Sequence, residues 1–214
     1  MKKFLTVVLS AAIILSGCTG NSKGETDTDS GETQTGAPAQ AELPENMESM
    51  REPIDALLMC SIDHADFEYD VNNSYDFWLS LYYFAGLYGP EHILADYNDG
   101  VLKLIHPTVQ EFASVLYADY DDLLELPEDM KDKVEYDADY DSYTFYTGDR
   151  GLCYTAITDC TDNEDGTYTI TAQLLDAVDN SLIGSGTFVL TENKYISGIV
   201  DARYMYSVSS FERN

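Results

Sequence analysis

The sequence predicts an α+β domain in which N-terminal helices pack on a C-terminal antiparallel β-meander. Two patterns favour this class: apolar residues recur at helical spacing from about residue 48 to residue 117, and at every second position after residue 140. Helices that precede a run of strands are typical of α+β domains, in which the helices cover one face of the sheet. A hydrophobic content of 44% and an aromatic content of 12% supply enough apolar area for a packed core.

Three helices are predicted in the first half of the chain. The second begins near Asn73 or Ser74, both good N-cap residues, and it is apolar on nearly every side until Gly89-Pro90 ends it. A short strand is expected over 101–105, and Pro107 opens the third helix directly after it. The first helix carries Pro53 in its first turn, and its apolar face is formed by Ile54, Leu57, Leu58 and Ile62.

The clearest strand is predicted over residues 167–174, where side chains alternate between two faces. Turns at intervals of about 8–12 residues indicate a meander. The order of helix, helix, strand, helix and meander resembles that of the cone-shaped NTF2-like fold. The inward face of the clearest strand is expected to hold Tyr168, Ile170, Ala172 and Leu174. Further strands are expected over 142–147, 152–159, 183–191 and 195–206.

The start of the chain has the features of a signal peptide. Two lysines precede a mostly apolar run from Phe4 to Leu15, which is too short to cross a hydrocarbon layer about 30 Å thick as a helix. The run ends in Leu15-Ser16-Gly17-Cys18, which resembles the lipobox of bacterial lipoproteins. An ordinary secretory signal followed by an incidental cysteine is the alternative interpretation.

The lipobox resemblance implies cleavage between Gly17 and Cys18 and a covalent diacylglycerol on the sulfur of Cys18. Two acyl chains hold a protein stably on a membrane, whereas a single chain binds marginally. The expected organisation is a signal peptide over 1–17, the lipidated cysteine and a disordered tether over 18–46, and an α+β domain over 47–214. The resemblance implies an anchor on the extracytoplasmic face of a cell membrane, and the acidic, tyrosine-rich body is similar to Gram-positive cell-surface proteins.

The chain is strongly acidic, with 39 Asp and Glu against 11 Lys and Arg and a formal net charge of −28. Such a chain has no means of neutralising phosphates, which argues against nucleic acid as a partner. The same imbalance argues against docking on anionic lipid through a basic face. The membrane is therefore expected to be reached through the lipid anchor alone.

Three aspartates in the acidic stretch are candidates for a metal site. Asp137, Asp139 and Asp141 have the one-three-five spacing of a calcium-binding EF-hand loop, and Ca²⁺ prefers clustered oxygen ligands. The match stops there, because Ser142 stands where the loop needs glycine and Gly148 where it needs glutamate. The sequence leaves a looser Ca²⁺ site as one interpretation and a solvated acidic turn as the other, and it predicts no other cofactor.

No catalytic residue is predicted. The sequence has no nucleophile motif of a hydrolase and no glycine-rich phosphate loop, and its three histidines are too widely spaced for a zinc motif. Cys153 and Cys160 fall on one predicted strand and are expected on opposite faces, too far apart for a disulfide while that strand is continuous. Pairing of Cys60 with one of them is left open.

Tyrosines of the acidic stretch are candidates for recognition. Tyr136, Tyr140 and Tyr143 are proposed as ligand-binding residues because tyrosine offers contact area at little entropic cost. The run from Val134 to Phe145 resembles a strand–turn–strand stretch of uncharacterised lipoproteins from Gram-positive gut bacteria, and this resemblance implies no activity.

The sequence thus predicts a lipid-anchored lipoprotein that acts as a ligand- or protein-binding module, with a cell-wall component, a sugar or a protein as its partner. A structural or accessory role in the cell envelope is the alternative, and an extracellular hydrolase is a further one. A binding module would present a concave sheet face or an exposed aromatic patch, whereas a hydrolase would present a cleft with a strongly perturbed histidine or carboxylate.

Overall fold

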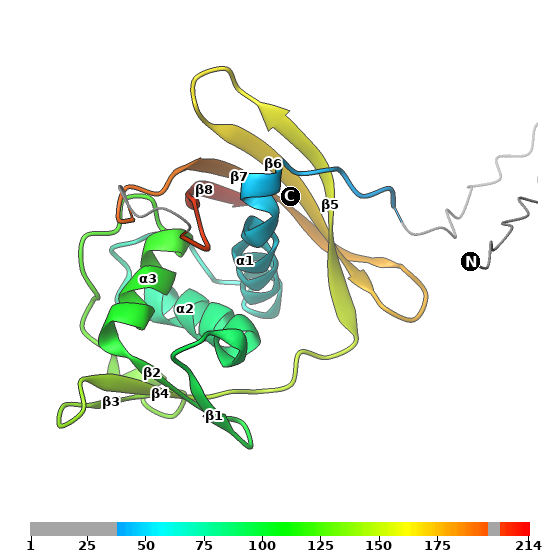
Figure 1. Cartoon of the computed structure of the whole chain (residues 1–214). Helices are drawn as coiled ribbons and strands as arrows, with labels where there is room; N and C mark the ends of the chain where they lie inside the picture. The colour runs from blue at the N-terminus through cyan, green and yellow to red at the C-terminus, as the bar shows by residue number, and fades with distance from the viewer. Residues whose placement is uncertain (1–37, 197–201) are drawn as a thin grey trace, which may run out of the picture. The chain divides into compact units, whose positions relative to one another are not determined.

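The computed structural model describes residues 38–196 and 202–214 (Figure 1), so the predicted cleavage site at Gly17 and Cys18 lies outside the described residues. The described part contains the α-helices α1 (Arg51–Asp63), α2 (Ser74–Tyr88) and α3 (His106–Leu116). Short 3₁₀ helices accompany them: η1 (Glu45–Met50), η2 (Gly89–Glu91) and η3 (Glu128–Met130). None of these helices has both the length and the apolar character needed to cross a membrane.

The strands of the described part form two antiparallel sheets of four. The first sheet has the order β1-β2-β4-β3, with β1 (Asp96–Asn98), β2 (Val101–Ile105), β3 (Val134–Asp137) and β4 (Ser142–Tyr146). The second is a meander of β5 (Cys153–Asp162), β6 (Tyr168–Asp176), β7 (Leu182–Glu192) and β8 (Tyr206–Arg213). The predicted α+β class with a C-terminal antiparallel meander is confirmed, and the first sheet adds a layer that was not predicted as such.

The helices pack against both sheets (Figure 1). Helix α1 lies on the second sheet, α2 contacts α1 and β4, and α3 contacts both β2 and β8. Glycine in β7 permits the close approach of α1, because a Cβ at Gly184 would lie 2.5 Å from Cδ1 of Ile62. One cluster of buried side chains joins the three layers, with Leu57 on α1, Phe84 on α2 and Phe145 on β4 among its members.

Helix α2 has the boundaries that its sequence predicts. The side-chain Oδ1 of Asn73 accepts hydrogen bonds from the backbone N–H groups of Tyr75 (3.1 Å) and Asp76 (3.4 Å), which caps the first turn. The helix ends at Tyr88, where Gly89 allows close contact with the first sheet. A Cβ at Gly89 would lie 2.6 Å from Cδ2 of Leu102, so a larger residue would clash with that side chain.

The strand pattern after residue 140 is confirmed in most places. In β6 the side chains of Ile170, Ala172 and Leu174 are buried toward the helices, and Thr171 and Gln173 between them are half-exposed. The predicted strands over 142–147, 152–159 and 183–191 correspond to β4, β5 and β7.

The strand predicted over 195–206 is wrong. The last strand is β8, which begins at Tyr206, and residues 197–201 lie outside the described residues. A turn follows β7 instead, because Oδ1 of Asn193 accepts a hydrogen bond from the backbone N–H of Tyr195 at 3.0 Å. The backbone N–H of Asn193 also donates to the carbonyl of Met205 at 2.9 Å, which brings the chain back to form β8.

The packed chain includes residues before the expected domain start at 47. The backbone N–H of Ala41 donates to the carbonyl of Ile157 on β5 at 2.8 Å. Leu43 is buried in the core cluster, and Met47 and Met50 of η1 are buried beside it. Residues 41–46 thus belong to the folded domain, because they cover part of the β5 edge and contribute to its core.

Candidate functional site

The hairpin formed by β3 and β4 carries the predicted metal and ligand residues, but it does not gather them on one surface. Tyr140 is 79% exposed at the tip, whereas Tyr143 faces inward, is 7% exposed and packs against Trp78 with ring centroids 5.1 Å apart. Burial raises the pKa of Tyr143 to about 12. Tyr136 is exposed at the sheet edge and packs beside Tyr143 at a centroid distance of 4.8 Å.

The three aspartates of the hairpin have separate roles in the turn. Oδ1 of Asp137 accepts a hydrogen bond from the backbone N–H of Asp139 at 3.0 Å. Asp141 instead accepts from the hydroxyl of Tyr136 at 2.9 Å and lies 3.0 Å from Nδ1 of His106. Within residues 38–196 and 202–214, no group of three or more His, Cys, Asp or Glu side chains is placed to hold a metal ion.

We expect the replacement of Tyr136 by phenylalanine to raise the pKa of Asp141. The Asp141 pKa is lowered, mainly by the hydrogen bond from Tyr136 and further by His106. A carboxylate with a lowered folded-state pKa stabilises the fold above its unfolded-state pKa, and this contribution is lost as the pH falls through the folded-state value. The variant therefore has less stabilisation to lose on acidification. A carboxyl ¹³C NMR titration of Asp141 measures the change, and Tyr140→Phe, which removes an exposed hydroxyl, is the control. Equal Asp141 pKa values in both variants would contradict the expectation.

The first sheet presents a solvent-facing surface, here called the outer face, opposite its buried Leu102, Leu104 and Phe145. The register pairs Lys103 of β2 with Thr144 of β4, and Thr144 with Glu135 of β3, so these side chains share one face. The outer face consists of Val101, Lys103, Ile105, Glu135, Asp137, Ser142, Thr144 and Tyr146.

Two adjoining hollows lie over the outer face, with volumes of about 330 and 580 Å³. Lys103 and Asp137 line both of them, and exposed Tyr140 lines the smaller one. The ammonium of Lys103 forms no ion pair with any residue that the structure describes. The hydroxyl of Tyr146 donates to Oε2 of Glu135 at 3.0 Å, which raises the Tyr146 pKa and extends the ring from β4 toward β3.

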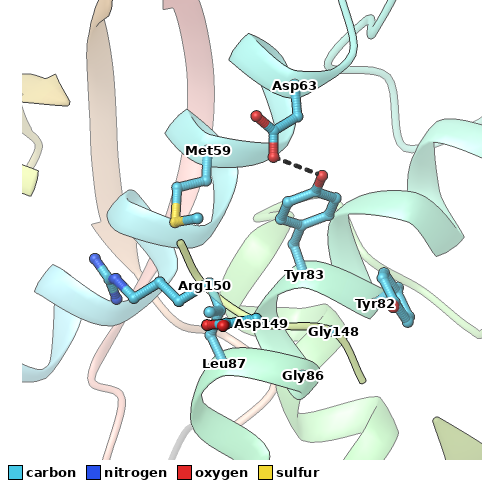
Figure 2. A pocket seen from close by; sticks show the side chains of 9 residues that line it. All are labelled: Met59, Asp63, Tyr82, Tyr83, Gly86, Leu87, Gly148, Asp149 and Arg150. Atoms are coloured by element: carbon cyan, nitrogen blue, oxygen red, sulfur yellow. Dashed lines mark hydrogen bonds between the residues drawn. The ribbon is translucent and has the colours of Figure 1, made fainter. Parts of the chain in front are cut away.

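A second concave site, here called the interhelical cavity, lies between α1, α2 and the segment that joins β4 to β5 (Figure 2). Its volume is about 130 Å³. Met59 and Leu87 line it with apolar groups, and Asp63 and Asp149 line it with carboxylates. The hydroxyl of Tyr83 donates to Oδ2 of Asp63 at 2.9 Å, as Figure 2 shows.

Arg150 lines the interhelical cavity, but its guanidinium is bound to α1 and α2. Its Nη2 lies 2.7 Å from Oδ1 of Asp55, a carboxylate that is only 3% exposed. The hydroxyl of Tyr88 donates to the other oxygen of Asp55 at 2.6 Å and accepts from Nη1 of Arg150 at 3.2 Å. Burial raises the pKa of Tyr88, and the neighbouring Asp55 raises it further, so the hydroxyl remains a donor. This triad fixes the segment between the two sheets to the helices.

Asp76 is a buried carboxylate with a capping role. Burial raises its pKa. Its Oδ2 accepts from Nδ2 of Asn73 at 2.6 Å and from the backbone N–H of Glu68 at 3.4 Å. The side chain of Asn73 in turn caps α2, so the carboxylate belongs to a reciprocal capping arrangement that fixes the start of the helix.

The cysteines of the described part are free thiols, namely Cys60, Cys153 and Cys160. The expectation that Cys153 and Cys160 face opposite ways is wrong, because a bulge near Thr158 shifts the register of β5. Cys153 pairs with Asp176 and Cys160 with Ile170, so both face the side of the sheet that covers the helices. Burial raises the pKa of all three thiols, which makes them small apolar groups at neutral pH.

The chain matches no known protein family, and no curated protein or solved structure is significantly similar to it. The candidate sites that the described structure offers are the outer face of the first sheet and the interhelical cavity.

Proposed function

We propose that the protein is a lipid-anchored extracytoplasmic binding module and that its outer face binds a neutral glycan. One observation carries this proposal: an exposed tyrosine ring, an unpaired lysine and two carboxylates share a sheet face beneath two adjoining hollows. Ligand sites commonly combine apolar and aromatic area with a few well-placed polar groups. The outer face has this combination, supplied by Tyr146, Lys103, Glu135 and Asp137.

The side-chain chemistry favours a sugar over other ligands. A sugar ring has a face of C–H groups, which packs on an aromatic ring, and an edge of hydroxyls, which need hydrogen-bond partners. Tyr146 supplies the ring, the carboxylates of Glu135 and Asp137 accept from hydroxyls, and Lys103 donates to them. Lys103 and Asp137 line both hollows, so a ligand of more than one ring could contact both.

The charge of the protein favours a neutral glycan over an anionic polymer. A net charge of −28 and the carboxylates beside Lys103 repel anions at the outer face. A protein partner would need a larger contiguous contact, since specific interfaces bury about 800 Å² on each side. A hydrolase has less support, because the buried carboxylate of Asp76 is already used in capping α2.

The anchor is proposed from the sequence. The resemblance of Leu15-Ser16-Gly17-Cys18 to a lipobox supports a diacylglycerol on Cys18, and two acyl chains give stable attachment. The likeness to an NTF2-like cone also stays a prediction, and the proposed glycan site does not depend on it.

Titration of the full lipidated chain with neutral oligosaccharides, including uncharged cell-wall glycan fragments, tests the proposal. The material is taken from a bacterial membrane fraction, and mass spectrometry of its N-terminal peptide is expected to show a diacylglyceryl cysteine at Cys18. Calorimetry is expected to detect binding of at least one oligosaccharide. Tyr146→Ala is expected to weaken it about 10-fold, because the ring is the main contact area.

Tyr195→Ala is the matched control, because Tyr195 is 48% exposed and Tyr146 is 42% exposed, yet Tyr195 lies outside the outer face. Loss of affinity in Tyr146→Ala alone would support the site. Equal loss in both variants, or binding only to a protein partner, would overturn the glycan assignment. A peptide that still begins at Met1 would overturn the anchor.

A further inference from the structure

We propose that Tyr136 is a surface site of one-electron oxidation and that it gives an electron to the oxidised indole of buried Trp78 through the ring of Tyr143. These three side chains are here called the aromatic relay. The reaction needs a one-electron oxidant from outside the protein and a proton acceptor beside Tyr136. The inference rests on ring contacts and on one hydrogen bond, so it stands or fails independently of the glycan proposal.

The rings of the aromatic relay are in contact from the core to the surface. Trp78 of α2 is fully buried, and its ring centroid lies 5.1 Å from that of Tyr143 on β4. The Tyr143 centroid in turn lies 4.8 Å from that of Tyr136 on β3, which is 44% exposed. The rate of electron transfer falls exponentially with the distance between donor and acceptor. Transfer along these contacts is therefore fast.

The hydroxyl of Tyr136 has a proton acceptor. It donates to Oδ1 of Asp141 at 2.9 Å. The pKa of Asp141 is lowered, mainly by this hydrogen bond and further by His106, whose Nδ1 lies 3.0 Å from the same oxygen. Asp141 is therefore a carboxylate at neutral pH. A phenol that has lost an electron is strongly acidic, so a carboxylate already bonded to its hydroxyl takes the proton as the electron leaves.

The reaction balances with an oxidant that accepts one electron without forming a bond. The oxidant takes one electron from the indole of Trp78 and leaves a radical cation. Tyr136 then gives one electron to this radical cation, by way of Tyr143, and gives its hydroxyl proton to Asp141. The products are a neutral phenoxyl radical on Tyr136, a protonated Asp141 and an indole in its original state. The transfer is favourable because a phenol that can lose its proton is oxidised at a lower potential than an indole.

The other tyrosines joined to the relay have no carboxylate at their hydroxyl. Burial raises the pKa of Tyr143 to about 12, and its hydroxyl has no hydrogen-bond partner among the described residues. Phe77 packs beside Trp78 and leads to Tyr117 and Tyr120. The Tyr117 hydroxyl pairs with a serine hydroxyl at 2.8 Å, and the Tyr120 hydroxyl bonds no carboxylate in the part of the chain that the structure describes. The radical therefore comes to rest at the exposed end of the relay.

A carboxylate partner alone does not define the site. Tyr146 is also exposed, and its hydroxyl donates to Oε2 of Glu135 at 3.0 Å. Its ring, however, makes no aromatic contact with the residues described by the structure, so it has no ring-to-ring route to Trp78. Tyr136 combines both properties: a carboxylate at its hydroxyl and a route to the core.

The test uses the full chain and a laser pulse that excites indole selectively. The pulse photoionises Trp78, and a cobalt(III) ammine complex captures the ejected electron and is reduced to cobalt(II). Transient absorption is expected to show a phenoxyl radical that forms as the indole radical decays. Tyr136→Phe is expected to lose the phenoxyl signal and to keep the indole radical. Tyr140→Phe is the matched control with an unchanged signal, because Tyr140 is 79% exposed in the same hairpin and has no ring contact within the described residues.

Asp141→Asn tests the proton transfer, because asparagine keeps the shape of the side chain and removes the charged acceptor. The phenoxyl radical is expected to form about 100-fold more slowly, at the lower end of what a positioned proton acceptor contributes. Far-ultraviolet circular dichroism checks that each variant is folded. An unaltered protein in which the indole radical persists, a wild-type phenoxyl yield in Tyr136→Phe, or an equal loss in Tyr140→Phe would overturn the proposal. An unchanged rate in Asp141→Asn would also overturn it, since the proton would then leave by another route.

Discussion

Replacing Trp78 with alanine is expected to lower the free energy of unfolding by about 4 kcal/mol. The indole is fully buried in α2, and its Nε1 donates to the carbonyl of Leu124 at 3.0 Å. Its ring also packs against Tyr143 of β4, so it joins the helical layer to the first sheet. Alanine would leave a cavity between these layers and remove the donor from a backbone carbonyl.

Urea denaturation followed by far-ultraviolet circular dichroism measures this loss. Tyr75→Ala is the control on the same helix, because the Tyr75 side chain is exposed and its removal is expected to change stability by less than about 0.5 kcal/mol. Trp78→Phe keeps an aromatic ring but lacks the N–H group, so it is expected to lose less than the alanine variant. If Trp78→Ala and Tyr75→Ala had the same unfolding midpoint, the described packing of Trp78 would be incorrect.

Replacing Arg150 with alanine is expected to cost about 3 kcal/mol of stability. The change leaves the carboxylate of Asp55 buried with Tyr88 as its remaining partner, and a buried charge without its counter-charge is strongly destabilising. We place the effect near the lower end of the usual range because the Arg150 side chain is one-third exposed and water reaches the site.

The same urea experiment on two further variants identifies the cause. Lys131→Ala breaks an exposed ion pair with Glu128 and is expected to change stability by less than about 1 kcal/mol. The double variant Asp55→Asn with Arg150→Ala is expected to be more stable than Arg150→Ala alone, because it removes the unpaired buried charge. A double variant that is less stable than the single one would show that Arg150 acts through packing instead of charge.

The helices and the C-terminal meander could be predicted because their signals are local. In α2 the cap at Asn73 and the stop at Gly89 are both visible in the sequence, and in β6 the alternation fixes the face of each residue. The first sheet is different, because β2 pairs with β4 across the whole of α3 and β1 has only three residues. Such pairing depends on contacts between distant segments, which a short apolar run does not specify.

The candidate sites were only partly predictable for the same reason. The tyrosines and aspartates of the hairpin stand out in the sequence, yet the fold turns Tyr143 inward and uses Asp141 to bind Tyr136. Asp55 and Arg150 are 95 residues apart and resemble ordinary surface charges. One available signal is that Asp55 lies between Ile54 and Leu58, on the apolar side of the first predicted helix. Lys103 also stands out in the sequence, because it is the single charged residue of the short strand predicted over 101–105.

Trp78 is the only tryptophan in the 214 residues. Fluorescence excited at wavelengths that tyrosine does not absorb therefore comes from this one side chain. The indole of Trp78 is buried against Tyr143, whose neighbours along β4 are Ser142 and Thr144 of the outer face. A ligand that shifts β4 would therefore alter the emission directly, without an attached dye. Trp78 is therefore an intrinsic fluorescent probe on the buried face of the first sheet.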